Sequence, residues 1–190
     1  MEETARPVSR LRTRELTLTA LFAALLAACT WLSVPMPKPL VPFTMQTFAV
    51  FLALLLLGGR RGLYAVVVYL LLGAVALPVF SGFRGGLDVL LGTTGGYLVG
   101  FVAMALVYWL LTARLGNALW WKIAGCVLGL AVCYAFGTAW FIRAYAASTG
   151  PIGVTAALGM CVFPFLLPDA VKLLLAAALA SRLAPRLRLE

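Results

Sequence analysis

The sequence predicts an all-α membrane protein with six transmembrane helices, and three features of the chain support this. Of its 190 residues, 64% are hydrophobic and only 11% are charged. The mean hydropathy is +1.05. A soluble globule needs more polar surface than this composition supplies. Because the apolar residues also gather into six separate stretches, we expect a multi-pass integral membrane protein.

The six apolar stretches lie at 15–34, 43–57, 62–80, 95–113, 119–141 and 161–183. The first follows a long basic segment and has no convincing small-residue cleavage site before Trp31, so we expect a retained helix rather than a removed signal peptide. We divide the chain into a basic cytoplasmic N-terminus (1–14), one six-helix membrane domain (15–184) and a cytoplasmic tail (185–190).

The second and the last predicted helices are unusually short. Since a helix rises about 1.5 Å per residue, a helix over 43–57 spans only ~22 Å and one over 168–183 only ~24 Å, against a hydrocarbon core of ~30 Å. Proline-containing chain precedes both helices: Pro35, Pro37, Pro39 and Pro42 before the second, Pro164 and Pro168 before the last. Non-helical backbone at membrane depth must be covered by protein or line a cavity. We therefore expect the two proline-containing segments to border a binding site.

The basic residues predict the orientation of the chain. One side carries eleven of them: Arg6, Arg10, Arg12, Arg14, Arg60, Arg61, Arg114, Lys122, Arg182, Arg186 and Arg188. The other side carries three: Lys38, Arg84 and Arg143. An excess of lysine and arginine marks the cytoplasmic side, which places both termini in the cytoplasm and the two proline-containing segments at the outer face. The net charge is +9, but the basic residues are not interleaved with aromatic residues as on a nucleic-acid-binding surface. We therefore expect no nucleic-acid partner.

Asp169 and Lys172 are two full charges near the start of the otherwise apolar last helix. Charge at membrane depth is functional or paired. Three residues apart, the two side chains share one helix face and can meet the same small molecule, the carboxylate accepting from N–H groups and the ammonium donating. The alternative is that the two charges only neutralise each other.

The loop 81–94 joins these segments at the outer face. Its Arg84 offers a cationic donor for a carboxylate, and Gly85 and Gly86 permit positive φ and close backbone approach to a ligand. Arg84 can instead pair with Asp88 at i+4 in a purely structural role.

Neutral polar and aromatic residues complete the predicted site. Thr44 and Gln46 supply hydrogen bonds at the start of the second helix, and Tyr97 and Trp140, with Phe165, supply apolar walls. Thr44 as a helix N-cap, and the aromatic residues as ordinary packing, are the alternatives. The groups suit a compact, partly apolar molecule with a polar ring and an acid.

The first helix carries a smooth stripe of small residues, Ala20, Ala24 and Ala28. Such a stripe lets another helix approach closely, either within the bundle or from a membrane partner.

We expect no metal site and no cofactor. Cys29, Cys126, Cys133 and Cys161 lie inside apolar runs, and the chain contains no histidine. We expect the cysteines to be packing residues. A membrane enzyme that uses Asp169 as a general base lacks the accompanying catalytic residues, and a channel would require oligomerisation.

These segments resemble the BioY family, the biotin-specific substrate-binding S components of energy-coupling factor (ECF) transporters. The resemblance covers 15–184 and rests on four motifs in order: Val41-Pro42-Phe43-Thr44-Met45-Gln46-Thr47; Arg84-Gly85-Gly86-Leu87 with Gly92-Thr93-Thr94-Gly95-Gly96-Tyr97; Gly137-Thr138-Ala139-Trp140; and Pro164-Phe165 with Asp169 and Lys172. The chain departs from the family pattern at Asp88, Thr93 and Pro168, which affects loop geometry and the start of the last helix.

The resemblance implies an ECF S-component-like bundle in a prokaryotic cytoplasmic membrane. It implies high-affinity biotin binding from outside and uptake in complex with a transmembrane coupling subunit and two ATP-binding subunits. It also implies that Asp169 and Lys172 handle the polar end of biotin, that Arg84 and its glycines close over the site, and that Ala20, Ala24 and Ala28 form the coupling surface. Because no Walker motif is present, any ATP hydrolysis belongs to the partners. The alternative within this fold is an S component for riboflavin, niacin or thiamine.

Overall fold

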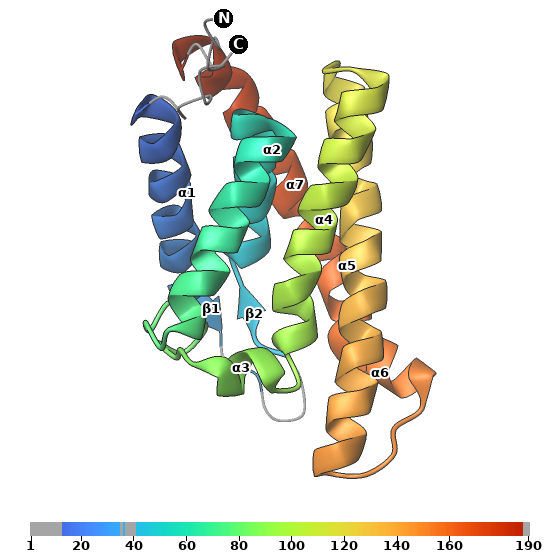
Figure 1. The fold of residues 1–190 in the computed structure, drawn as a ribbon. Coiled ribbons are helices and arrows are strands. Elements are labelled where there is room, and N and C mark those ends of the chain that lie inside the picture. The colour runs from blue at the N-terminus through green and yellow to red at the C-terminus, as the bar shows by residue number, and fades with distance from the viewer. Residues whose placement is uncertain (1–12, 35, 37–40, 188–190) are drawn as a thin grey trace, which may run out of the picture.

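The structure, a computed structural model, describes residues 13–34, 36 and 41–187 and is mostly helical (Figure 1). In chain order its elements are α1 (Thr13–Trp31), β1 (Ser33–Val34), β2 (Phe43–Thr44), α2 (Gln46–Ala74), α3 (Leu87–Leu91), α4 (Gly95–Leu115), α5 (Leu119–Ser148), α6 (Val154–Cys161) and α7 (Phe163–Leu187). Among the described residues, five helical segments are long and apolar enough to cross a membrane: α1, α2, α4, α5 and the combined α6–α7 segment. The prediction of a multi-pass helical membrane protein is thus confirmed at this level.

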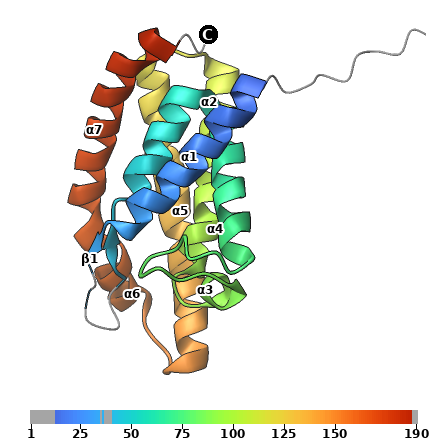
Figure 2. The same cartoon turned by 90° about the vertical axis from the view of Figure 1, so that its left-hand side faces the viewer.

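Helix α2 contains a sharp reversal at Gly58, where the backbone adopts φ 79° and ψ 174°. Glycine reaches this positive φ without the steric cost that a side chain would add. The two legs of α2 then run side by side (Figures 1 and 2). Their packing is close, because a Cβ atom on Gly62 would lie 3.2 Å from the Cα atom of Leu54. The predicted stretches 43–57 and 62–80 correspond in the main to the two legs of this one element. The second leg ends at Ala74, so 75–80 belong to the following loop rather than to a helix.

The segment before α2 differs from the prediction of a helix that begins at residue 43. Phe43 and Thr44 form β2, which pairs antiparallel with β1 in the register Ser33↔Thr44 and Val34↔Phe43. Helix α2 begins only at Gln46. The β1–β2 pair satisfies backbone groups that the proline-rich connection cannot satisfy within a helix. Pro35, Pro37 and Pro39 lie outside the described residues.

The last helix begins earlier than predicted. Helix α7 starts at Phe163 rather than at Pro168 and contains 25 residues, so it is not short and irregular chain does not directly precede Pro168. Pro164 occupies the first turn, where a helix has no internal partner for its N–H groups anyway. Pro168 forfeits one backbone hydrogen bond close to that end.

Two other elements also differ from the prediction: α5 extends seven residues beyond the predicted 141, and the short α6 was not predicted.

The segment between α2 and α3 folds back onto the end of α1. The indole nitrogen of Trp31 donates to the carbonyl of Pro78 at 2.8 Å. The Trp31 ring also stacks on Phe83 with centroids 5.2 Å apart. Phe80 and Arg84 pair through their backbones. The loop is thus held by α1 rather than lying free in solvent.

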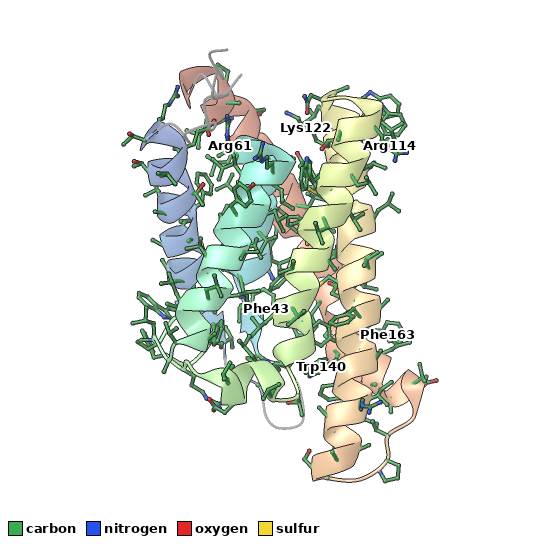
Figure 3. The ribbon with its side chains drawn as sticks, in the orientation of Figure 1. Phe43, Arg61, Arg114, Lys122, Trp140 and Phe163 are labelled. Carbon is green, nitrogen blue, oxygen red and sulfur yellow. The ribbon has the colours of Figure 1, made fainter. Side chains whose placement is uncertain are left out.

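Basic side chains gather at the end of the bundle where α1 begins and α7 ends. Figure 3 shows Arg61, Arg114 and Lys122 at this end. Arg61 forms an ion pair with Glu15 of α1. The opposite end holds α3 and the β1–β2 pair (Figure 1).

Helices α4 and α5 approach each other through glycines. A Cβ atom on Gly129 of α5 would lie 2.7 Å from the carbonyl oxygen of Met104 of α4, and one on Gly100 would lie 2.9 Å from the sulfur of Cys133. Such contacts allow close backbone packing, which is a main source of helix association within a membrane.

We predict that Gly129→Ala destabilises the protein by about 1–3 kcal/mol, because the added methyl group overlaps the backbone of α4. The measurement is the thermal unfolding midpoint in detergent. Gly159→Ala is the matched control, since a Cβ atom at Gly159 of α6 meets nothing within 4 Å. An equal midpoint for the two variants would contradict this account of the α4–α5 contact.

Candidate functional site

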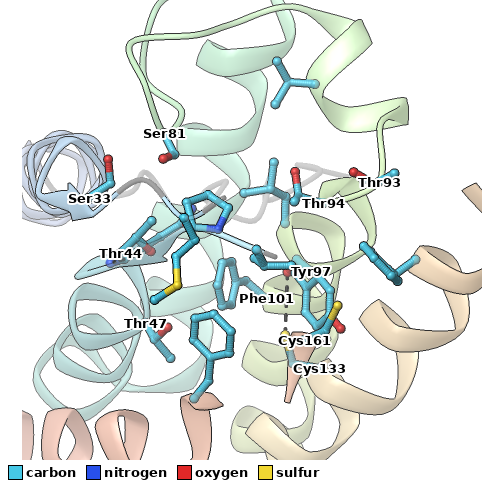
Figure 4. Close-up of a pocket in the computed structure, with 18 of the residues that line it drawn as sticks. Ser33, Thr44, Thr47, Ser81, Thr93, Thr94, Tyr97, Phe101, Cys133 and Cys161 are labelled. Atoms are coloured by element: carbon cyan, nitrogen blue, oxygen red, sulfur yellow. Dashed lines mark hydrogen bonds between the residues drawn. The ribbon is translucent and has the colours of Figure 1, made fainter. Parts of the chain in front are cut away.

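A cavity of about 890 Å³ lies toward the end of the bundle that holds α3 and the β1–β2 pair. Figure 4 shows how residues from several elements converge on it, among them Ser33, Thr44, Ser81, Thr94 and Tyr97. Helices α4, α5 and α7 also contribute to the lining, among them Phe101, Tyr134 and Phe165. Its volume falls within the usual range for small-molecule sites.

Asp169 and Lys172 line this cavity and are paired with each other. The ammonium nitrogen of Lys172 donates to Oδ1 of Asp169 at 2.7 Å, and each side chain is only 4% exposed. The pair has no net charge, so a ligand meets both an acceptor and a donor without a large unbalanced field. The predicted shared helix face is therefore present, and so is the mutual neutralisation that was its alternative.

Lys172 has two further protein contacts, both on β2. Its ammonium donates to the backbone carbonyl of Thr44 at 2.8 Å and lies 4.2 Å from the centroid of the Phe43 ring. A cation over an aromatic face is electrostatically favourable, the more so when both groups are desolvated. Phe43 in turn stacks on Phe165 of α7. Lys172 thus fastens α7 to the strand pair between α1 and α2.

Tyr134 of α5 is a site residue that the sequence analysis missed. Its hydroxyl donates to Oδ2 of Asp169 at 2.5 Å, and its side chain lines the cavity. A signal existed, because a tyrosine in the middle of an apolar helix needs a hydrogen-bond partner for its hydroxyl group. The sequence did not reveal that this partner is Asp169, since that depends on the rotation of α5 relative to α7.

Thr44 and Gln46 both line the cavity, and each also has an internal partner. The hydroxyl of Thr44 accepts from the backbone N–H of Gln46 at 3.4 Å. The side-chain nitrogen of Gln46 donates to the hydroxyl of Tyr69 at 2.9 Å. Tyr69 also donates to the carbonyl of Val79. The carbonyl oxygen of the Gln46 side chain remains the group of this residue that can meet a ligand.

Tyr97 and Trp140 have different positions. Tyr97 lines the cavity, and its hydroxyl shares a hydrogen bond of 2.9 Å with Thr138. Trp140 is not among the residues that line the cavity. Its indole nitrogen donates to the carbonyl of Gly92 at 3.0 Å, and its side chain lies against Gly96. The structure therefore places Trp140 at the corner between α3 and α4, where it supports the wall of the cavity from outside.

The loop residues Arg84, Gly85 and Gly86 lie near the cavity, and only Arg84 lines it. Arg84 is largely exposed and pairs with Asp88 at 3.1 Å, which is the structural alternative that the spacing allowed. Gly85 packs against the carbonyl of Leu77, with no room for a side chain. Gly86 has φ 109° and donates its N–H to Gly73 at 2.7 Å. The two glycines shape the loop that carries Arg84.

The alanine stripe lies on α1, apart from the cavity. Ala20, Ala24 and Ala28 are exposed, whereas Ala23 and Ala27 between them are buried in the core. The stripe is thus available to another helix. Within the described part of the chain, no group of three metal-binding side chains is found.

Comparison with known proteins places this chain in a family. A model of the BioY family matches residues 2–189. The biotin transporter BioY of Thermotoga maritima is 40% identical over 170 residues, which is 90% of this chain and 95% of that protein. A probable biotin transporter BioY of Pyrococcus horikoshii is 36% identical over 173 residues, 91% of this chain and 98% of that protein.

The fold is also found in a crystal structure of the S-component for biotin from an ECF-type ABC transporter. The two structures superpose with a TM-score of 0.78 over 90% of each chain, at 23% sequence identity. The family model and the two relatives, which match nine-tenths of the chain or more, lead to one conclusion. This chain belongs to the BioY family.

Proposed function

We propose that this chain is the membrane-embedded substrate-binding subunit for biotin uptake by an ECF transporter. The observation that carries the proposal is the cavity of about 890 Å³ with a buried acid–base pair in its wall, found in a chain of the BioY family. The relatives named above are transporters, so the proposed role is binding and delivery without a chemical step on the ligand.

The cavity offers a partner for each part of biotin. Asp169 accepts from an N–H group of the urea ring, and the side-chain oxygen of Gln46 and the hydroxyls of Thr44 and Tyr97 add neutral contacts. Phe165 and the apolar cavity wall cover the sulfur-containing ring and the carbon chain.

Arg84 is the cation that we assign to the carboxylate of biotin. Lys172 already contacts Asp169, the Thr44 carbonyl and the Phe43 ring. Among the described residues, the guanidinium of Arg84 pairs with Asp88, and that pair is exposed to solvent. An exposed ion pair is weak and is easily exchanged for a ligand carboxylate. Biotin would then lie with its ring toward the Asp169–Lys172 pair and its acid toward the loop.

Nanomolar affinity, as capture of a trace vitamin demands, corresponds to about −12 kcal/mol. Two or three charge-assisted hydrogen bonds at roughly 1.5–3 kcal/mol each do not reach this value. Apolar burial, at about 25 cal/mol per Å², supplies the remainder. Asp169 and Arg84 therefore determine specificity and orientation, and the cavity wall contributes much of the affinity.

The proposed topology counts the two legs of α2 as separate segments, which gives six membrane crossings. The basic end with Arg61, Arg114 and Lys122 is assigned to the cytoplasm of a prokaryotic cell, and the cavity to the outer side. The exposed face of Ala20, Ala24 and Ala28 is assigned to the transmembrane coupling subunit, which two ATP-binding subunits would drive. The division at 1–14, 15–184 and 185–190 follows from this topology.

We predict that detergent-purified protein binds labelled biotin tightly and that excess riboflavin, thiamine or niacin does not displace it. Equilibrium binding with these competitors is the measurement. An uncharged biotin ester should bind more weakly, because it cannot pair with Arg84. If folded protein binds none of the ligands, or binds another vitamin in preference, the biotin assignment is wrong.

We predict that Asp169→Asn abolishes biotin binding and destabilises the fold by about 3–5 kcal/mol, because it leaves the buried charge of Lys172 without its counterion. The double variant Asp169→Asn with Lys172→Met removes both charges and should recover much of the stability without recovering binding. Thermal unfolding and equilibrium binding separate the two effects. Biotin binding by the double variant at the wild-type level would show that the pair is only structural.

We predict that Ala24→Leu leaves biotin binding intact and abolishes uptake, because the larger side chain blocks a close helix contact on α1. The assays are binding to the purified subunit and uptake in cells that express the complete transporter. Ala135→Leu is the control, since Ala135 is also exposed but lies on α5. A parallel loss of binding and uptake in Ala24→Leu would argue against a docking surface.

A further inference from the structure

A second pocket lies at the basic end of the bundle and shares no lining residue with the cavity of the candidate site. Its volume is about 340 Å³. The start of α1, the reversal in α2 and the end of α4 line it, and they contribute Glu15, Arg61 and Trp109 among other residues. Figure 3 shows Arg61 at this end of the bundle. Because helices that can cross a membrane end or turn back here, the pocket lies near the boundary between membrane and water.

Close packing and a hydrogen bond give this pocket a defined form. Gly59 lies against α4, since a Cβ atom there would be only 2.5 Å from the Cα atom of Trp109. Arg60 is held by Tyr64, whose hydroxyl accepts from the Arg60 Nε at 3.0 Å. The guanidinium carbon also lies 5.8 Å from the centroid of the Tyr64 ring. Within the described part of the chain, this hydrogen bond uses one of the five N–H donors of the guanidinium group, so the others can meet a ligand.

The charges around the pocket leave one arginine without an acidic partner. Arg61 forms an ion pair with Glu15. Among the residues that the structure describes, Arg60 forms no ion pair. Both arginines follow Gly58 in the first turn of the second leg of α2, which is the positive end of the helix dipole, where an anion is favourable and a further cation is not. The pocket therefore attracts an anion, and a planar guanidinium group can bind a phosphate through two parallel N–H groups.

The surface beside the pocket is apolar. Trp109 and Ala113 line the pocket. Leu106 and Leu110 continue the same face of α4, because the four residues follow the spacing i, i+3, i+4 and i+7, and all four are exposed. An acyl chain can lie along this face while a phosphate attached to it occupies the pocket. Tryptophan is also typical of the headgroup level of a membrane. A soluble phosphate would have no use for such a face.

We propose that this pocket binds the phosphate group of an anionic membrane lipid such as phosphatidylglycerol, with Arg60 as the main contact and an acyl chain along the face of α4 that carries Leu106 and Leu110. A general excess of basic residues at this end explains why arginines occur here. It does not explain a pocket in which one arginine is held by Tyr64 and lacks an acidic partner. The proposal does not depend on which vitamin the chain binds.

The test measures lipid binding to the full-length chain in detergent by native mass spectrometry. The probes are phosphatidylglycerol and phosphatidylcholine with identical acyl chains, so that only the headgroup differs, and glycerol 3-phosphate as a soluble source of the same phosphate chemistry. Arg60→Gln removes the arginine without an acidic partner, and Glu15→Gln releases Arg61 from its ion pair. Arg182→Gln is the matched control, since Arg182 is exposed on α7 and does not line the pocket.

The wild-type chain should bind phosphatidylglycerol more tightly than phosphatidylcholine by roughly fivefold or more, because the positive pocket repels the choline ammonium. Arg60→Gln should weaken binding of phosphatidylglycerol by roughly fivefold, and Glu15→Gln should strengthen it by roughly two- to fivefold, because a second arginine becomes available. Arg182→Gln should leave it unchanged, and excess glycerol 3-phosphate should not displace the lipid. The thermal unfolding midpoints of the variants should stay close to that of the wild type, because exposed charges contribute little to stability.

Equal binding of the two lipids would overturn the proposal. Equal losses in Arg60→Gln and Arg182→Gln would also overturn it, because they would show a diffuse effect of the basic end rather than a site. Displacement by glycerol 3-phosphate would assign the pocket to a soluble phosphate instead. If the wild-type chain shows no lipid preference and Arg60→Gln prevents assembly with the transmembrane coupling subunit, the pocket belongs to that protein interface.

The Glu15→Gln variant keeps the proposal testable if Arg60→Gln does not fold, because its expected effect has the opposite sign. Unchanged or weaker binding of phosphatidylglycerol by Glu15→Gln would contradict the proposal. Failure of the wild-type chain to bind biotin is a separate result, since it would overturn the proposed function and leave the lipid site unaffected.

Discussion

The buried ion pair between Asp169 and Lys172 is the constraint on which the rest of the site depends. Two charges at membrane depth are costly unless each is paired and hydrogen-bonded. The pair therefore requires further polar partners from neighbouring elements, and the structure supplies them as the Thr44 carbonyl of β2 and the Tyr134 hydroxyl of α5. Segments far apart in the sequence are thus drawn together around α7.

This requirement also explains the irregular chain beside the pair. Most carbonyl groups inside a helix already accept a bond within the helix, so non-helical chain is the readier source of a backbone oxygen for Lys172. The β1–β2 pair provides such a carbonyl at Thr44 and pairs part of its remaining backbone within the two-stranded ladder. The same short strands place Thr44 beside the cavity and Phe43 under the ammonium. Irregular backbone at depth is here a way of lining a cavity.

The sequence predicts those features of the fold and the site that depend on residues close together in the chain. The apolar helices and the pairing of Asp169 with Lys172 follow from composition and from spacing along one helix. The Arg84–Asp88 pair likewise lies at i+4. The predicted start of α7 at Pro168 is wrong. Proline was taken as a helix boundary, whereas a proline near the start of a helix is compatible with helical structure.

Features that depend on contacts between helices escaped the sequence analysis. Tyr134 meets Asp169 only because α5 and α7 adopt a particular rotation and depth. Trp140 uses its indole N–H on the carbonyl of Gly92, outside the cavity, although its motif placed it among the site residues. Neither outcome is encoded in a local spacing. A hydroxyl or indole N–H group on an apolar helix indicates that the group has a hydrogen-bond partner. Which residue is the partner depends on the tertiary structure.

The attachment of Trp31 has a mechanical consequence for the rim of the cavity. Trp31 is the last residue of α1, and it holds Pro78 by a hydrogen bond and Phe83 by ring stacking. Ser81 and Arg84, which line the cavity, belong to that same loop. A force that tilts α1 would therefore move Trp31 and this part of the cavity rim together.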